Sequence, residues 1–424
     1  MSDDSGFLGI VAALINRSRT KNALRRVQEN NYENQGITHY SPSQIEAFFD
    51  ETEPFGNMAF SGGLNSIRAR AIARAAECAY IQGYSVIVLH CSNQELDNTL
   101  TSYFGNNYIC SVNAGNPVYD PFWGMSNGEI SRLILASTSK EYQINPVGKY
   151  YLDGISDFLR AKGIQPYCQM YITCPHLTLI DKINDSEAKG QITNNQARMI
   201  LMQIMQGEIE RGNIENFFLN FSSQAGALLA KKPMLKYAIN VAIASQRKQI
   251  FAIDIQTSTN SLLINLLMSE AEMLVMRGRK VMVIADNIQQ SDGNLLQNFL
   301  KKSSSNCSIV LSADDVFSSF GGEENAFFAF IGKCSRVILS KHSSAYSCQK
   351  WADYIGYYDK QEISTSYSQN ANFVGHWGLS STSSANVSVK RENIVKPEDI
   401  QRFEVNEALI INKSTGEKAF TRIV

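Results

Sequence analysis

The stretch NMAFSGGLNSIRARAIARAAECAYIQGYSVIVLH, residues 57–90, decides the fold of this 424-residue chain. A short apolar run over residues 57–60 stops at a glycine turn. Residues 66–82 then contain no Pro or Gly and are rich in Ala and Arg, a composition that favours helix. Residues 84–90 are β-branched and apolar, as in a buried strand. Strand, glycine turn, helix and strand form a βαβ unit, which predicts a parallel sheet covered by helices.

The rest of the chain repeats the strand pattern on both sides of a helical stretch. Strand-like runs occupy residues 249–255, 280–285, 307–311, 336–339 and 408–412, the last of which we expect to be the final strand. Helical patterns cover residues 149–162, 195–207, 214–229 and 234–245. We therefore predict an α/β fold with a mainly parallel central sheet flanked by helices, plus an all-helical insertion. The Ser-rich residues 380–388 are predicted to be a loop, and Lys396-Pro397-Glu398 to open a short helix.

This pattern suggests a division into domains. Residues 1–45 form an N-terminal lead, residues 46–149 and 216–424 form the sheet-bearing domain, and residues 150–215 form the inserted all-α domain. Within the lead, the apolar residues 7–15 are followed by several Arg and Lys. They predict either a short amphipathic tether on a membrane surface or a helix that packs on its own domain, because they are too short to span a bilayer.

Composition excludes several classes of protein. Thirty-nine Lys and Arg against 40 Asp and Glu leave a net charge of −1, so a globally basic nucleic-acid binder is excluded. Hydrophobic residues make up 44% and charged residues 19%, which excludes wholesale disorder. The eight Cys contain no C-x-x-C pair, so we expect buried thiols of a reducing cytosol rather than a zinc site.

The glycine turn is the first candidate site. A turn between a strand and a helix can offer backbone N–H groups and the positive helix end to an anion. The candidate nucleotide-binding residues are Ser61, Gly62, Gly63, Leu64, Asn65, Ser66, Ile67, Arg68 and Ala69.

Three interpretations of this turn remain open. The P-loop pattern G-x-x-x-x-G-K-[ST], started at Gly62, places Ile67, Arg68 and Ala69 at its Gly, Lys and Ser/Thr. Ile67 is bulky, Ala69 lacks the hydroxyl that holds Mg²⁺, and Arg68 is not equivalent to Lys. The S-G-G-x-D-S pattern of N-type ATP pyrophosphatases fits five of six positions, with Asn65 in place of Asp. The third interpretation is a turn that only joins a strand to a helix.

Two further features bear on this site. The strand 281–285 ends in Asp286-Asn287, where a RecA-like NTPase has Asp acting on Mg²⁺ through water and Glu polarising the attacking water. Asp286 is thus a candidate Mg²⁺ ligand, or else an Asp that caps the turn after the strand. Asn287 cannot accept a proton at neutral pH. Arg68, Arg70 and Arg74 do not share one helix face, and we interpret them mainly as solvated charges.

Beyond these motifs, most of the chain resembles the type IV secretion and conjugative coupling ATPases, the TraG/TraD kind within the FtsK/HerA superfamily. Order and spacing carry the resemblance rather than any single motif. NPVYDP at 116–121 is similar to the loop that follows the second core strand in that family. The other segments are SIVLSADDVF at 308–317, Phe320-Gly321, residues 332–340, SCQKWADYIG at 347–356, SVKRE at 388–392, KPEDI at 396–400 and EALI at 407–410.

The resemblance implies a RecA-like P-loop NTPase fold, ATP and Mg²⁺ as cofactors, and hexameric rings that pump DNA or protein. This chain departs from the family at Ile67, Arg68, Ala69 and Asn287, and has Ser312-Ala313 where the family places a polar sensor. We therefore expect a pseudo-ATPase or weak nucleotide binder that recruits substrate or partners. The alternative is an adenylating enzyme of the ATP pyrophosphatase type.

The resemblance also implies partners and a location. Expected partners are secretion or conjugation components, an intact partner ATPase and DNA, in a homo- or hetero-oligomer. The expected location is the bacterial cytoplasm, with at most peripheral contact at the inner face of the plasma membrane. We expect the two N-terminal membrane spans of the family to be trimmed or replaced by residues 7–15.

Overall fold

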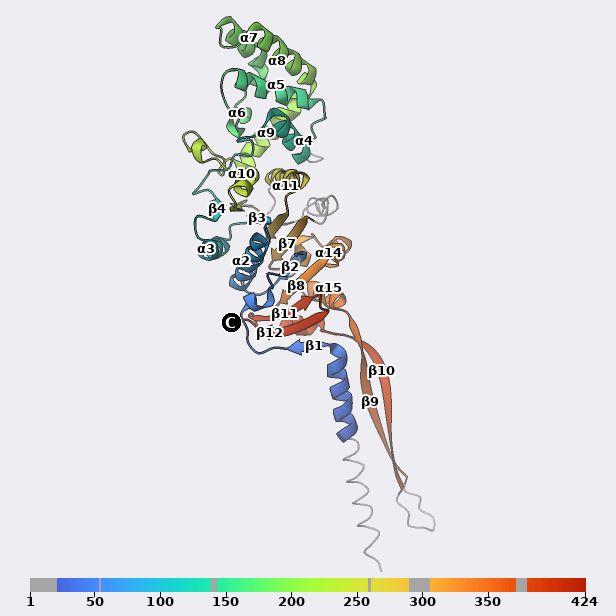
Figure 1. The fold of residues 1–424 in the computed structure, drawn as a ribbon. Helices are drawn as coiled ribbons and strands as arrows, with labels where there is room; N and C mark the ends of the chain where they lie inside the picture. The colour runs from blue at the N-terminus through green and yellow to red at the C-terminus, as the bar shows by residue number, and fades with distance from the viewer. Residues whose placement is uncertain (1–20, 53–54, 139–142, 258–260, 290–305, 371–379) are drawn as a thin grey trace, which may run out of the picture. The chain divides into compact units, whose positions relative to one another are not determined.

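The computed structural model describes residues 21–52, 55–138, 143–257, 261–289, 306–370 and 380–424 (Figure 1), with the main chain alone for 365–370 and 380–387. The predicted tether at residues 7–15 lies outside this range. The chain divides into two compact units. One unit contains Ser43–Leu339 and Ile423–Val424, and the other contains Met1–Pro42 and Ser340–Arg422.

The larger unit is built on a parallel sheet with the strand order β8-β2-β7-β6-β3-β5-β4. The strands are β2 (Asn57–Ser61), β3 (Ser85–His90), β4 (Ile109–Val112), β5 (Ile250–Asp254), β6 (Val281–Asp286), β7 (Cys307–Ala313) and β8 (Cys334–Ser340). Every residue of β6 is buried, as expected for a parallel strand covered on both faces. The predicted α/β fold with a mainly parallel sheet is confirmed.

Helix α2 (Asn65–Ile81) completes the βαβ unit predicted from residues 57–90. Its Ala side chains are buried against β2, β3, β6 and β7, since small side chains let the helix approach the sheet closely. The other helices that accompany the sheet are η1 (Ile45–Phe48), α3 (Gln94–Phe104), α11 (Ser261–Met276), α13 (Val316–Ser319) and α14 (Glu324–Ile331).

The arginines of α2 are not solvated charges, and that prediction is wrong. Arg70 makes two hydrogen bonds to Glu46, at 2.8 and 2.7 Å. Arg74 pairs with Glu77 at 2.6 Å and with Glu51 at 3.0 Å. Arg68 is 3% exposed. The sequence could not reveal this, because most of these partners lie outside the helix.

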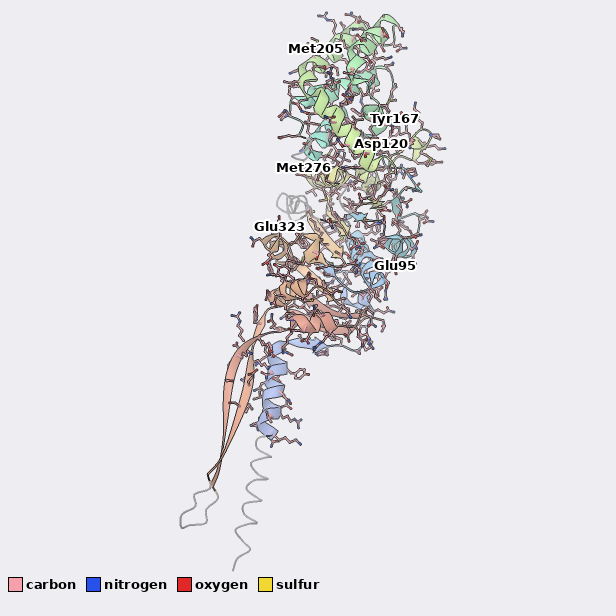
Figure 2. All side chains as sticks on the ribbon, turned by 180° about the vertical axis from the view of Figure 1, so that it is seen from behind. Glu95, Asp120, Tyr167, Met205, Met276 and Glu323 are labelled. Atoms are coloured by element: carbon pink, nitrogen blue, oxygen red, sulfur yellow. The ribbon has the colours of Figure 1, made fainter. Side chains whose placement is uncertain are left out.

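Between β4 and β5 the described chain is helical. Its elements are α4 (Asn127–Ser137), α5 (Gly148–Ala161), α6 (Cys168–Ile172), η3 (His176–Thr178), α7 (Leu179–Ala188), α8 (Asn194–Gly207), η4 (Glu208–Glu210), α9 (Arg211–Ala225), η5 (Met234–Tyr237) and α10 (Val241–Gln246). Helices α5 and α8 pack closely because Gly207 faces Tyr151, where a Cβ atom would lie 2.4 Å from the Tyr151 nitrogen. The opposite side of α8 is exposed, including Met205 (Figure 2).

The predicted helical patterns at 149–162, 195–207 and 214–229 are confirmed as α5, α8 and α9. The pattern at 234–245 is not one helix. It breaks between η5 and α10 because Ile239 exchanges hydrogen bonds with Val118 and Asp120. The helical segments extend beyond 150–215 on both sides, and the domain limits proposed from the sequence stay a prediction.

The smaller unit contains residues 21–35 as a helix, α15 (Ala345–Ile355), α16 (Pro397–Arg402) and two sets of strands. In the first set β1 (Ile37–His39) pairs in parallel with β12 (Glu417–Arg422), which pairs antiparallel with β11 (Glu407–Asn412). The short helix predicted at Pro397 is confirmed as α16. The prediction that 408–412 is the last strand is wrong, because β12 follows it.

A long hairpin forms the second set and corrects another prediction. Residues 380–388, predicted to be a loop, belong to β10 (Ser380–Asn393), which pairs with β9 (Tyr357–Asn370) from Ser380↔Asn370 to Asn393↔Tyr357. The ladder is made by backbone groups, so a Ser-rich sequence can form it without an apolar face. In the part of the chain that the structure describes, no helix is both long and apolar enough to cross a membrane.

Candidate functional site

The glycine turn between β2 and α2 is short. Gly62 and Gly63 have φ angles of 82° and 71°, in the left-handed region that favours glycine. The Gly62 N–H donates to the Ala313 carbonyl at 3.1 Å, which fixes the turn to the end of β7. Since α2 begins at Asn65, only Gly62–Leu64 form the connection. Ile67, Arg68 and Ala69 therefore lie in the first two turns of α2, and all three are buried.

Arg68 turns back onto this glycine turn. Its Nη1 donates to the carbonyls of Gly62 and Gly63 at 3.2 and 3.1 Å, and its Nη2 pairs with Asp314. The Arg68 side chain is 4% exposed, whereas the Asp314 side chain is 82% exposed. The turn thus directs two carbonyl oxygens at a cation, whereas an anion site directs N–H groups at its ligand.

Of the remaining residues at the turn, Ser61 uses its hydroxyl inside the protein. Ser61 is 2% exposed, and its hydroxyl accepts from the Val316 N–H at 2.9 Å. Leu64 precedes the first residue of α2 and makes no side-chain cap. Ser66 follows in the first turn of α2 and is half-buried.

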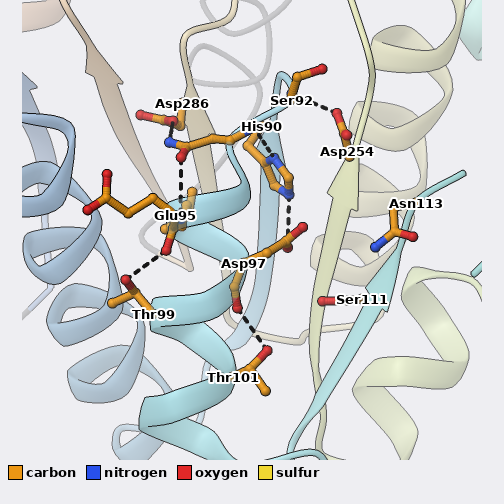
Figure 3. Close-up of polar contacts among 12 residues, drawn as sticks. His90, Ser92, Glu95, Asp97, Thr99, Thr101, Ser111, Asn113, Asp254 and Asp286 are labelled. Carbon is orange, nitrogen blue, oxygen red and sulfur yellow. Dashed lines mark hydrogen bonds and ion pairs between the residues drawn. The ribbon is translucent and has the colours of Figure 1, made fainter. Parts of the chain in front are cut away.

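Asp286 ends β6 and is fully buried (Figure 3). Its Oδ2 accepts from the side-chain amide of Asn93 at 2.6 Å. Asn93 and Asn65 also exchange side-chain hydrogen bonds at 2.9 and 3.0 Å. Oδ1 of Asp286 has no hydrogen-bond partner among the described residues, and neither has Oγ of Ser312, which lies opposite Asp286 on β7.

Asn287, which the sequence pattern compares with a catalytic Glu, lies in the turn after β6. Its φ angle is 53°, a left-handed conformation that Asn tolerates better than most residues. Its N–H donates to the Ser312 carbonyl at 2.8 Å, and its Oδ1 accepts from the Asp314 N–H at 3.2 Å. The side chain therefore supports the same residue, Asp314, that pairs with Arg68.

The predicted site residues thus meet at one edge of the sheet. The turn, Asp286 and Asn287 lie at the carboxyl ends of β2 and β6, as ligand sites do in parallel sheets. Sequence reasoning missed Asn93, which links them, and Asp314, the partner of Arg68. Asn93 had a detectable signal, because it directly precedes the helical run QELDNTL and is a typical N-cap. The described residues contain no group of three His, Cys, Asp or Glu that could hold a metal ion.

Comparison with solved structures finds this fold in conjugative coupling proteins. The chain matches the bacterial coupling protein TrwBdeltaN70 in complex with sulphate with a TM-score of 0.51 and 10% identity, over 92% of this chain and 93% of that one. It matches TrwB in complex with the GTP analogue GDPNP with a TM-score of 0.50 and 9% identity, over 90% and 91%. The match to VirB4 of Thermoanaerobacter pseudethanolicus has a TM-score of 0.45 and 11% identity, and it covers 90% of this chain and 92% of that one.

No protein-family sequence model matches the chain, and no curated protein matches it by sequence. The solved structures show the fold. The chain has the fold of the conjugative coupling proteins, and the fold predicted from the resemblance is confirmed.

Proposed function

We propose that this protein is a coupling-protein-like module of a secretion or conjugation apparatus that does not hydrolyse ATP and acts by recruiting substrate or partners. The fold supports the likeness to coupling proteins. The contacts around the glycine turn support the absence of ATP hydrolysis.

The conformation of Arg68 carries the proposal. A nucleotide phosphate in the turn would need N–H groups directed at it, but the Gly62 and Gly63 carbonyls are directed inward at the guanidinium. Releasing Arg68 would leave two carbonyls and a buried guanidinium without partners, at about 1–3 kcal/mol for each buried group. The bound guanidinium therefore competes with phosphate for the turn.

The residues at the positions compared with catalytic residues of ATPases also support a protein that does not hydrolyse ATP. Asn287 cannot act as a general base, and its side-chain oxygen is already used by the Asp314 N–H. Ala69 supplies no hydroxyl for Mg²⁺. Asp286 keeps a carboxylate, but the side-chain amide of Asn93 already donates to its Oδ2 at 2.6 Å, and Asn93 is held in turn by Asn65. The chain thus fits ATP and Mg²⁺ poorly.

The partners remain those that the family resemblance suggested: secretion or conjugation components, an intact partner ATPase and DNA. The alternative of an adenylating enzyme gains no support from the contacts of its key residue, because the Ser61 hydroxyl is buried and bonded to the Val316 N–H.

Phosphate release from ATP with Mg²⁺ tests the proposal. We expect no turnover above that of Asp286→Ala prepared in parallel. Turnover that depends on Mg²⁺ and disappears in Asp286→Ala would contradict the proposal. A melting-temperature titration with ATP separates weak binding from none, since saturation at 100 times Kd adds about 2.7 kcal/mol of stability. We expect no shift at millimolar ATP.

A further inference from the structure

A polar cavity lies at the carboxyl ends of β3, β4 and β5, and several of its lining residues are labelled in Figure 3. Its volume is about 530 Å³, and all eight residues that line it are polar while none is basic. Two of them are carboxylates, Asp97 from α3 and Asp254 from β5. Ser111, which also lines the cavity, has a buried Oγ without a hydrogen-bond partner among the described residues.

The charge of the cavity is not neutralised internally. Asp97 accepts from Nε2 of His90 at 3.1 Å. Because Nδ1 of His90 accepts from the Asn93 N–H, the ring donates to Asp97 through Nε2. Asp254 accepts from the N–H groups of Ser92 and Gln256, at 2.8 and 2.9 Å. Neither carboxylate has a Lys or Arg partner in the described part of the chain. We call this site the acidic cavity.

A surface loop of the same unit has the opposite charge. Residues 231–237 (KKPMLKY) contain three exposed Lys and no acid, and Tyr237 is 54% exposed. Lys231, Lys232 and Lys236 make no ion pair with any described residue, and Nζ of Lys236 lies over the Tyr237 ring, 4.7 Å from its centroid. We call this segment the basic loop.

The base of the basic loop is fixed. The Ala230 N–H donates to the Tyr119 carbonyl at 2.8 Å, and the Ile239 N–H donates to the Val118 carbonyl at 2.9 Å. Ala230 and Ile239 are both buried. Two ends held side by side make a compact loop that presents its side chains outward. Fixing the base lowers the entropic cost of docking.

We propose that the basic loop of one copy docks in the acidic cavity of a second copy, with a Lys ammonium between Asp97 and Asp254. The cavity offers only hydrogen-bonding groups and negative charge, which suits an ammonium with three donors. The loop supplies that charge on a rigid base. The contact is independent of nucleotide, so it does not depend on whether the protein hydrolyses ATP.

Sedimentation of the full-length protein over a concentration series tests this. We expect self-association at low ionic strength that weakens as salt is added, since the pairing is electrostatic. Two variants, Lys231→Glu/Lys232→Glu/Lys236→Glu in the loop and Asp97→Asn/Asn98→Lys in the cavity, should each weaken it about tenfold or more. Glu95→Gln is the matched control, because Glu95 is on the same helix but does not line the cavity.

Carbodiimide cross-linking of mixed isotope-labelled and unlabelled protein gives a direct readout. We expect peptides that join a loop Lys of one copy to Asp97 or Asp254 of another. A monomer at every concentration, or association that neither variant changes, would overturn the proposal. Weaker self-association in the loop variant but not in the cavity variant would also overturn the proposal. So would binding of an oligonucleotide to the wild-type loop in protein that does not self-associate. Circular dichroism of each variant checks that it is folded.

Discussion

The side-chain amide of Asn93 donates to Oδ2 of Asp286 at 2.6 Å and joins the start of α3 to the end of β6. Asn93 also accepts from the Leu96 N–H at 3.1 Å, as the N-cap of α3, and bonds to Asn65 at the start of α2. One uncharged side chain therefore supports a buried carboxylate and two helix starts.

Asn93→Ala should be strongly destabilising. The change removes an N-cap, which costs about 1 kcal/mol, and leaves a buried carboxylate without its partner, which costs about 1–3 kcal/mol. Asn65→Ala removes only the amide pair and should cost about 1 kcal/mol. Urea unfolding measures both. Equal losses of unfolding free energy in Asn93→Ala and Asn65→Ala would show that the bonds of Asn93 to Asp286 and Leu96 add no stability beyond its bond to Asn65.

Asp286→Asn should leave stability unchanged or raise it. The wild-type carboxylate is fully buried with one partner, and an amide would remove the buried charge and could donate toward Ser312. If Asp286 instead binds Mg²⁺, wild-type protein should gain melting temperature with millimolar Mg²⁺ and the variant should not. We expect no Mg²⁺ effect in either protein.

Arg68→Met and Asp314→Asn should have unequal effects, although the two residues form one ion pair. Arg68 is buried and serves two carbonyls, so its loss should cost about 2–4 kcal/mol. Asp314 is 82% exposed, so its contribution should be below about 1 kcal/mol. Chemical denaturation of both variants checks this ratio. A larger loss for Asp314→Asn would mean that the ion pair, rather than the carbonyl contacts, holds Arg68.

Stability should decrease as the pH rises from about 5 to about 9. Burial raises the pKa of Glu270 to about 8 and that of Asp120 to about 7. Over that range the folded chain binds more protons than the unfolded chain, whose carboxyls ionise near about 4, so each pH unit costs free energy of folding. The contribution of these two carboxyls to stability is fully present below about pH 4. It is lost as the pH rises through their pKa values in the folded chain, about 7 for Asp120 and about 8 for Glu270. Melting temperatures across this range measure it.

Glu270→Gln is the control for this pH dependence. Glu270 accepts from the Tyr119 hydroxyl and from the Val241 N–H at 2.9 Å, so an amide keeps one acceptor and loses the titration. The variant should lose part of the slope with pH even if it is less stable overall. Asp120 accepts from the Cys168 N–H at 2.9 Å and should supply the remaining slope. An unchanged slope in Glu270→Gln would contradict the assignment.

Local patterns in the sequence predicted the sheet and many of its helices. The βαβ unit at residues 57–90, the strands that follow and the helices α5, α8 and α9 were predictable because apolar periodicity and helix propensity act over a few residues. The same reasoning failed at β10, where backbone pairing formed a strand from a Ser-rich segment. The Ser-rich composition of residues 380–388 indicates that the strand has no buried apolar face, but such a composition does not by itself indicate a loop.

The sequence by itself determined that the chain is α/β and that Ile67, Arg68, Ala69 and Asn287 depart from the ATPase pattern with which it was compared. Only the tertiary structure decided what these residues do instead. Arg68 meets Asp314, 246 positions away, and Asn93 meets Asp286, 193 positions away. Contacts over such separations depend on strand order, which no local pattern encodes. The departures from the P-loop pattern were therefore visible in the sequence, but the contacts that Arg68 and Asn93 make were not.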